Sequence, residues 1–213
     1  MSSRIALSFS LAGLLGGCTI YGTELTSLPA VRPESAQVYD CPKIPKLSSF
    51  PPSGATLCFS MRGVQMEVAA QNGETVAFAI GPLFPVLPFF PERSGAGPLR
   101  IEIGFKADRS YSFDPWEAAL QTDQGESVGI SKVSANLRDG GPDRTVEIDR
   151  RERGGRMVEA STWGRFLLTF EKPIAPEQAF SLTLLLRSRD GADVQLPTIS
   201  FKEGKVSYLG VIP

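Results

Sequence analysis

Hydrophobic and polar residues alternate in short runs along most of the chain after residue 55, and glycine or proline ends most of the runs. The clearest run covers residues 99–107. In it Leu99, Ile101, Ile103 and Phe105 alternate with Arg100, Glu102, Gly104 and Lys106. A period of two residues predicts a strand that buries one face in an antiparallel sheet.

Further short runs predict more strands, at residues 55–61, 64–70, 75–80, 163–170, 180–186, 194–196, 199–202 and 206–211. Arg62 and Gly63 indicate a turn between the first two, and Asn72-Gly73 predicts a hairpin before the third. Residues 115–121 fit either two helical turns or a strand. Many short strands separated by Gly and Pro predict an all-β fold for residues 55–213, namely an antiparallel β-sandwich of immunoglobulin-like character.

Residues 18–54 differ from this pattern because prolines interrupt them at positions 29, 33, 42, 45, 51 and 52. Proline fixes φ and removes a hydrogen-bond donor, so neither a helix nor a central strand is expected there. The segment is predicted to be an extended tether that leads into the sandwich.

The chain begins with a short basic start at Arg4, an apolar run over residues 5–15 and the small residues Gly16 and Gly17. These are the parts of a secretory signal peptide. The run is too short to cross a hydrocarbon core of about 30 Å, which needs roughly 20 residues. Residues 1–17 are therefore predicted to be removed.

Leu15-Gly16-Gly17-Cys18 resembles the lipobox of bacterial lipoproteins. The resemblance implies cleavage before Cys18 and acylation of that cysteine, with palmitate among the chains. The resemblance also indicates which membrane holds the protein. In this family an Asp directly after the cysteine usually retains the protein in the inner membrane. Thr19 stands there instead, so we expect a lipid anchor in the outer membrane and a domain that faces the periplasm.

Three cysteines are present, and acylation of Cys18 leaves Cys41 and Cys58. In an oxidising compartment these two are expected to form a disulfide, worth about 3 kcal/mol in the chain-entropy model. Two buried free thiols are the alternative.

The chain contains no histidine, and its formal net charge is −1. The first fact excludes Ser-His-Asp and Cys-His catalysis and histidine-ligated zinc. The second argues against nucleic acid, which binds basic surfaces. No nucleotide or hydrolase motif occurs, so we predict no enzyme activity, no cofactor and no metal.

Prolines at positions 82, 85, 88 and 91 repeat every three residues, which matches polyproline II. Between them lie only apolar side chains, and an apolar segment of this size must be covered. One interpretation is a strand at an edge of the sandwich, where proline is tolerated. The other is a contact surface for an envelope protein or for lipid, formed by Leu83, Phe84, Val86, Leu87, Phe89 and Phe90.

Two polar segments offer weaker candidates. Residues 138–157 carry six arginines and five acids, which predicts a solvated charged hairpin, with an anion site as the alternative. In residues 108–117, Tyr111 and Trp116 are candidates for stacking on a sugar. The structural alternative places Phe113 and Trp116 in the core.

The sequence therefore predicts an outer-membrane lipoprotein that acts as a non-enzymatic binding or assembly module of the cell envelope. The alternatives are a module that binds envelope glycans through Tyr111 and Trp116 and, less favoured, a hydrolase that uses paired carboxylates.

Overall fold

A computed structural model describes residues 18–32, 34, 36–41, 56–72, 74–81, 84–89, 97–137, 144–151, 155–189 and 193–212. Its strands form antiparallel sheets, and the predicted all-β sandwich is confirmed. An immunoglobulin-like connectivity stays a prediction. No helix in these ranges is long and apolar enough to span a membrane.

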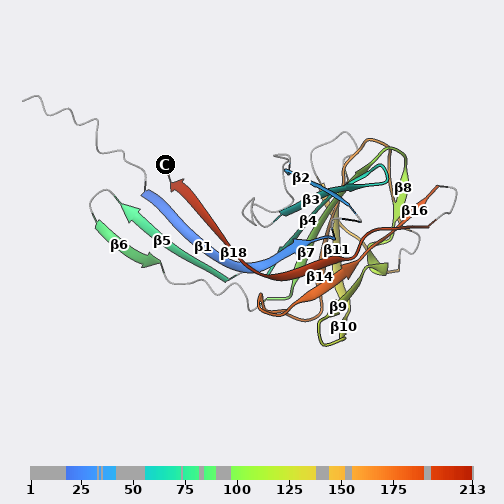
Figure 1. The fold of residues 1–213 in the computed structure, drawn as a ribbon. Coiled ribbons are helices and arrows are strands. Elements are labelled where there is room, and N and C mark those ends of the chain that lie inside the picture. Colours follow the sequence, from blue (N-terminus) through green and yellow to red (C-terminus); the bar gives the residue numbers. More distant parts are fainter. Residues whose placement is uncertain are drawn as a thin grey trace, which may run out of the picture.

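The strands form two large sheets and one small sheet (Figure 1). Sheet A runs in the order β10 (Ser127–Val128), β9 (Ala119–Thr122), β15 (Phe180–Thr183), β18 (Ile199–Ile212), β1 (Cys18–Ala30), β5 (Glu74–Gly81) and β6 (Phe84–Phe89). Sheet B runs in the order β12 (Arg144–Glu147), β11 (Ile130–Leu137), β14 (Gly164–Phe170), β7 (Arg100–Ala107), β4 (Val64–Gln71), β3 (Thr56–Met61) and β2 (Gln37–Tyr39). Sheet C contains β13 (Arg156–Val158), β8 (Tyr111–Phe113), β16 (Leu185–Ser188) and β17 (Asp193–Gln195).

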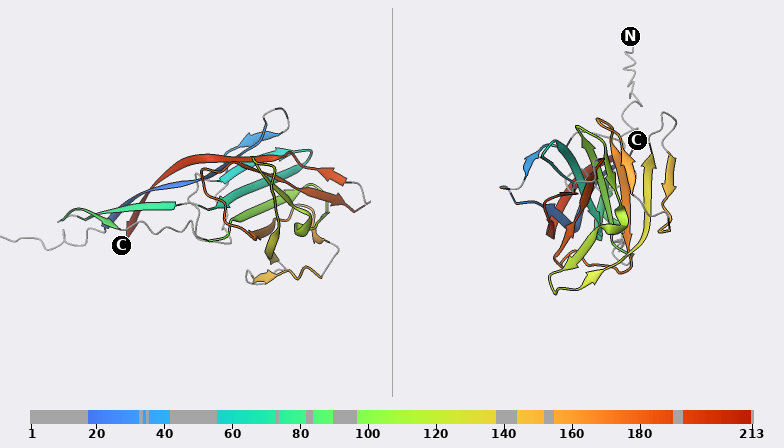
Figure 2. Two further views of the ribbon diagram at one scale, coloured as in Figure 1. Left: turned by 90° about the horizontal axis from the view of Figure 1, so that it is seen from below. Right: turned by 90° about the vertical axis from the view of Figure 1, so that its right-hand side faces the viewer.

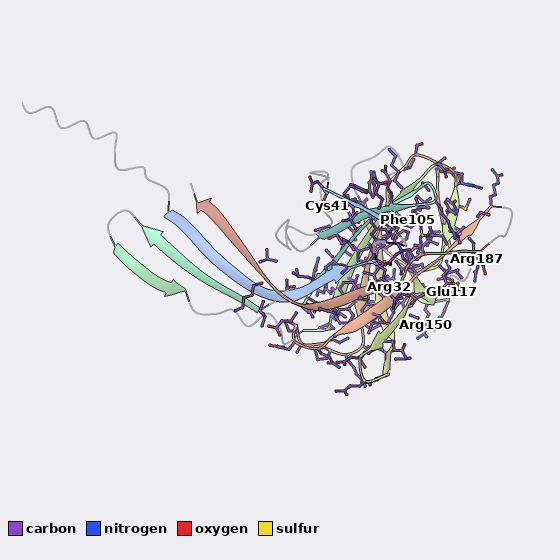
Figure 3. All side chains as sticks on the ribbon, in the orientation of Figure 1. Arg32, Cys41, Phe105, Glu117, Arg150 and Arg187 are labelled. Carbon is purple, nitrogen blue, oxygen red and sulfur yellow. A yellow bond between two sulfur atoms is a disulfide. The ribbon has the colours of Figure 1, made fainter. Side chains whose placement is uncertain are left out.

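The core of the sandwich contains the apolar face that the sequence predicts for β7. Ile101, Ile103 and Phe105 are each at most 1% exposed. Phe105 stacks on Phe166 of β14 with ring centroids 5.9 Å apart, and its edge meets Phe113 at 5.5 Å. Figure 3 labels Phe105 within the rounded part of the molecule. These contacts join sheets B and C in one core.

The predicted turn between β3 and β4 is confirmed. Met61 and Val64 are register partners, so Arg62 and Gly63 form a two-residue loop. Their φ angles of 49° and 78° are both positive, as a type I′ hairpin turn requires. The Gly63 carbonyl also accepts a hydrogen bond from the backbone N–H of Asp108 at 3.0 Å.

The hairpin predicted at Asn72 is wrong, because β4 lies in sheet B and β5 lies in sheet A. Asn72 instead marks the point where the chain passes between the sheets. Its amide nitrogen donates to the Ser27 hydroxyl and to the Ile174 carbonyl, both at 2.9 Å. Its amide oxygen accepts from the Ser27 N–H at 3.2 Å. With 6% of its surface exposed, Asn72 ties β1 to the sandwich.

The tether predicted for residues 18–54 is wrong for Cys18–Ala30, which form β1 between β18 and β5. Pro29 pairs only with Phe201 of β18, since β5 pairs no further along β1 than Leu25. A proline is tolerated where a strand has one neighbour. Residues 42–55 lie outside the described part of the chain.

The segment 115–121 is expected to form either two helical turns or a strand, and it contains a short piece of each. Pro115–Glu117 form one 3-10 turn (η4), and β9 follows it. The Asp114 side chain caps the turn by accepting a hydrogen bond from the Trp116 N–H at 3.0 Å. Leu120 is buried in the core.

The charged segment 138–157 is not one hairpin. Its first strand, β12, pairs with β11 of sheet B, while β13 pairs with β8 of sheet C. The described part is largely exposed, and Lys132 bridges Glu147 at 2.7 Å. Ile148 lies between β12 and β13 in the sequence. Its side chain is buried and belongs to the core.

Four strands of sheet A extend beyond the sandwich as an arm (Figures 1 and 2). We define the arm as residues 18–25 of β1, all of β5 and β6, and residues 205–212 of β18. The rest of the described residues form the body. The described strands of sheet B lie within the body and do not follow the arm.

Candidate interaction site

A row of charged positions crosses the arm where it leaves the body. Leu25 of β1 is the register partner of Lys205 on one side and of Glu74 on the other, and Glu24 is its neighbour. Glu24 lies one position nearer the tip of the arm, between Val206 and Thr75. Apart from Glu24, the described residues of the four strands beyond this row contain no Asp, Glu, Lys or Arg. The uncharged end comprises residues 18–23, 75–81, 84–89 and 206–212. At about 3.3 Å per residue, seven residues extend roughly 20 Å.

The register aligns apolar residues in rows across this uncharged end. Tyr21 pairs with Leu209 and with Phe78, so the three form one row. The next row joins Ile20, Gly210, Ala79 and Leu87. An apolar sheet without the second layer of the sandwich needs another cover.

The proline segment forms the outer strand of the arm. Phe84–Phe89 pair with β5, so they follow the two-residue period of a strand and not the three-residue period of polyproline II. The segment does lie at a sheet edge, because β6 ends sheet A, but this edge belongs to the arm and not to the sandwich. The contact-surface interpretation stays a prediction. Leu83 and Phe90 lie outside the described residues.

Cys18 is the first residue of β1 and pairs with Ile212 of β18. It therefore stands at the far end of the uncharged part of the arm, away from the body. A lipid on Cys18 would bring this end of the arm to a membrane surface.

The body contains a second unusual feature, a buried ion cluster on the outer face of sheet B. Arg165 Nη2 lies 2.9 Å from Glu67 Oε2, and Arg165 Nη1 lies 3.4 Å from Glu102 Oε1. The three side chains are 6–8% exposed. The guanidinium also lies 5.7 Å from the centroid of the Trp163 ring. One guanidinium thus neutralises part of the charge of two carboxylates that are shielded from water.

The sheet register explains how these groups meet. Tyr39, Cys58, Glu67, Gly104 and Arg165 are consecutive partners across β2, β3, β4, β7 and β14. Gly104 lies between the acid and the base. A Cβ atom at Gly104 would stand 3.4 Å from Glu67 Oε2 and 3.4 Å from the Trp163 ring. Arg165 reaches Glu67 across the strand that carries Gly104.

Tyr39 completes this row on β2. Its hydroxyl is buried and has no hydrogen-bond partner within the described ranges. Burial raises the pKa of the Tyr39 phenol above 10.0, and the negative charge of Glu67 raises that pKa further. Both effects disfavour the phenolate.

The predicted disulfide between Cys41 and Cys58 is confirmed, with the Cα atoms 5.2 Å apart. This distance is ordinary for a disulfide. Figure 3 shows Cys41 beside β2, and Cys58 lies on β3, so the bond ties the chain after β2 to the second strand from this edge of sheet B.

The predicted pair of sugar-stacking residues does not form. Tyr111 is 2% exposed and belongs to the core, so its ring is not available to a ligand. Trp116 packs against the core, as its structural interpretation predicts, and Arg150 lies 5.7 Å from the centroid of its ring. Nearby, Arg187 Nη2 donates to both carboxylate oxygens of Glu117 at 2.7 and 2.8 Å (Figure 3).

Two open hollows on the body were considered as ligand sites. The first, of about 440 Å³, is lined by residues that include Arg62, Lys106 and Asp108. The second, of about 450 Å³, is lined by Arg109, Ser110, Ser188 and Arg189. A glycosidase needs two carboxylates at one cleft, and neither lining contains two. The carboxylates of Glu67 and Glu102 line a third hollow, but its volume of about 10 Å³ is too small for a sugar.

Comparison with known proteins adds no information about the site. The sequence matches no model of a known protein family, and no curated protein is significantly similar to it.

Proposed function

We propose that this protein is an outer-membrane lipoprotein that acts as a non-enzymatic binding or assembly module of the cell envelope. In this proposal a lipid on Cys18 anchors the chain, the body is a stable scaffold, and the arm makes the contact. The candidate contact surface comprises Leu83, Phe84, Val86, Leu87, Phe89 and Phe90, together with the strands beside them.

One observation carries the proposal. The residue that resembles a lipidation site, Cys18, stands at the end of an arm whose described residues beyond Glu24 and its partners Thr75 and Val206 are uncharged. An uncharged sheet rich in apolar residues is costly to leave in water. An anchor and an uncharged contact surface at the same place support a role at the envelope membrane.

The experiment that tests the anchor is fractionation of cells that produce the Cys18→Ala variant. We expect the variant to lose labelling with radioactive palmitate and to move from the membrane fraction to the soluble fraction. Its thermal unfolding should match that of the wild type, because Cys18 lies outside the core. The Thr19→Ala variant keeps Cys18 and should remain in the membrane. Palmitate labelling that survives in Cys18→Ala would contradict the anchor.

A further inference from the structure

The outer edge of β18 is unpaired along most of its length in the described structure. β15 pairs only with Ile199, Ser200 and Phe201 of β18. From Lys202 to Ile212, β1 is the one described strand beside β18. About half of the backbone N–H and C=O groups of this segment face away from β1 and lack a described strand partner.

The chemistry of this edge favours pairing with another strand. Residues 206–212 are Val, Ser, Tyr, Leu, Gly, Val and Ile, with neither a charge nor a proline. Natural proteins normally protect an exposed edge with lysine, proline or a bulge. An uncharged segment rich in Val, Ile and Tyr at an open edge is a known hazard for uncontrolled association. Such a segment calls for a specific partner strand.

The other edge of the arm is protected. β6 ends sheet A and carries Pro85 and Pro88, which have no N–H to donate. Repeated head-to-tail pairing of β18 with β6 of another copy is therefore disfavoured. The two edges of the arm therefore differ in their backbone donors: β6 lacks two N–H groups, whereas residues 202–212 of β18 contain no proline.

We propose that β18 pairs in antiparallel fashion with β18 of a second copy of this chain. A two-fold axis perpendicular to the sheet at Leu209 generates the pair, and the two arms become one continuous sheet. This contact goes beyond the proposed envelope function, and it rests on that function only for the lipid that confines the copies to one membrane.

Three features favour a second copy as the partner. An antiparallel edge is self-complementary, and two-fold dimers are the commonest oligomers. With the axis at Leu209, Val206 faces Ile212 of the other copy, so Lys205 lies beyond that partner's described strand and no like charges oppose each other. The same axis leaves both Cys18 residues on the same side of the sheet, and a shared membrane raises their effective concentration.

The test is a scan of single cysteines at residues 206–212, in the full-length lipoprotein within its membranes, under mild oxidation. Leu209→Cys should form disulfide-linked dimers, because Leu209 would face its own copy. Tyr208→Cys and Gly210→Cys should not, since two residues along the strands separate each from its own copy by more than the ~7 Å that a disulfide spans. Wild-type protein should form no disulfide-linked dimer, because it has no cysteine in residues 206–212.

Two matched controls sharpen the scan. Val206→Cys and Ile212→Cys should each fail alone, while the double variant should cross-link. Val146→Cys on the exposed edge strand β12 measures random collision, and Leu209→Cys should exceed its dimer yield by about tenfold through the high local concentration of a true pair. An even yield along β18, a yield no higher than that of Val146→Cys, or dominant adducts to a different protein would overturn the proposal. Palmitate labelling of the same samples reports the anchor separately.

Discussion

The body and the arm both consist of antiparallel strands, but they differ in where charged residues occur. The body encloses charge, since Arg165, Glu67 and Glu102 lie buried on sheet B. The described arm beyond Glu24 contains no charge. A buried ion cluster needs a fixed protein frame around it, whereas an uncharged sheet favours an apolar partner. We therefore propose that the body provides stability and that the arm makes the contact.

The largest expected effect comes from breaking the ion cluster. Arg165→Met leaves the carboxylates of Glu67 and Glu102 buried without this guanidinium, so we expect a loss of about 3–5 kcal/mol in the free energy of unfolding. Urea unfolding of the purified lipoprotein in detergent, followed by tryptophan fluorescence, measures it. Adding Glu67→Gln and Glu102→Gln to the variant should restore part of the loss.

Lys132→Met is the matched control for this prediction. It also removes a cation from an ion pair in sheet B, but Lys132 and Glu147 are more than half exposed. An exposed pair is worth at most about 1 kcal/mol. Equal losses in the two variants would contradict the special role of the buried cluster.

A smaller effect is expected at the base of the arm. Asn72→Ala removes three hydrogen bonds and leaves the Ser27 N–H and the Ile174 carbonyl buried without Asn72. The expected loss is about 2–4 kcal/mol, measured by urea unfolding. Hydrogen exchange should accelerate in residues 25–30 of β1 more than in β7.

The exposed amide of Gln124 provides the control for Asn72. Gln124→Ala should change the free energy of unfolding by no more than about 0.5 kcal/mol. If Asn72→Ala accelerated exchange equally in β1 and β7, the residue would support the whole fold and not the junction in particular.

The smallest effect concerns pH. Because the Tyr39 pKa is raised above 10.0 in the folded state, the fold favours the neutral phenol. This contribution is fully present below pH 10 and is lost as the pH rises from 10 through the folded pKa. Tyr39→Phe should change stability by less than about 1 kcal/mol at neutral pH and should lose less stability than the wild type above pH 10. Parallel curves for the two proteins from pH 8 to 11.5 would contradict it.

Local patterns predict those parts of the fold that depend on neighbouring residues. The alternation in β7 and the Arg62-Gly63 turn are examples, since burial of one face and two positive φ angles determine them. The Asn72-Gly73 hairpin fails because Asn72 makes its hydrogen bonds to Ser27 and Ile174, which are distant in sequence. The sequence does not predict β1, because Pro29 interrupts the β-forming residues and its pairing with Phe201 depends on a distant strand.

The candidate site shows the same division. The apolar proline segment and Cys18 stand out in the sequence, and the confirmed disulfide follows from cysteine pairing. The charge row at Lys205, Leu25 and Glu74 is invisible until the register of three strands is known. Glu102 lies on the polar side of an alternating strand, so the sequence suggests exposure. Only the approach of Arg165, from another strand, buries it.

The most direct test of the account is photo-crosslinking in living cells from a reactive residue at Phe89 of β6, read by mass spectrometry. The same reactive residue at Val146, which is 39% exposed on the body, is the control. We predict a dominant intermolecular adduct to one envelope protein from Phe89 and none from Val146. Adducts only within the same chain, or equal adducts from both positions, would contradict the arm as the contact surface.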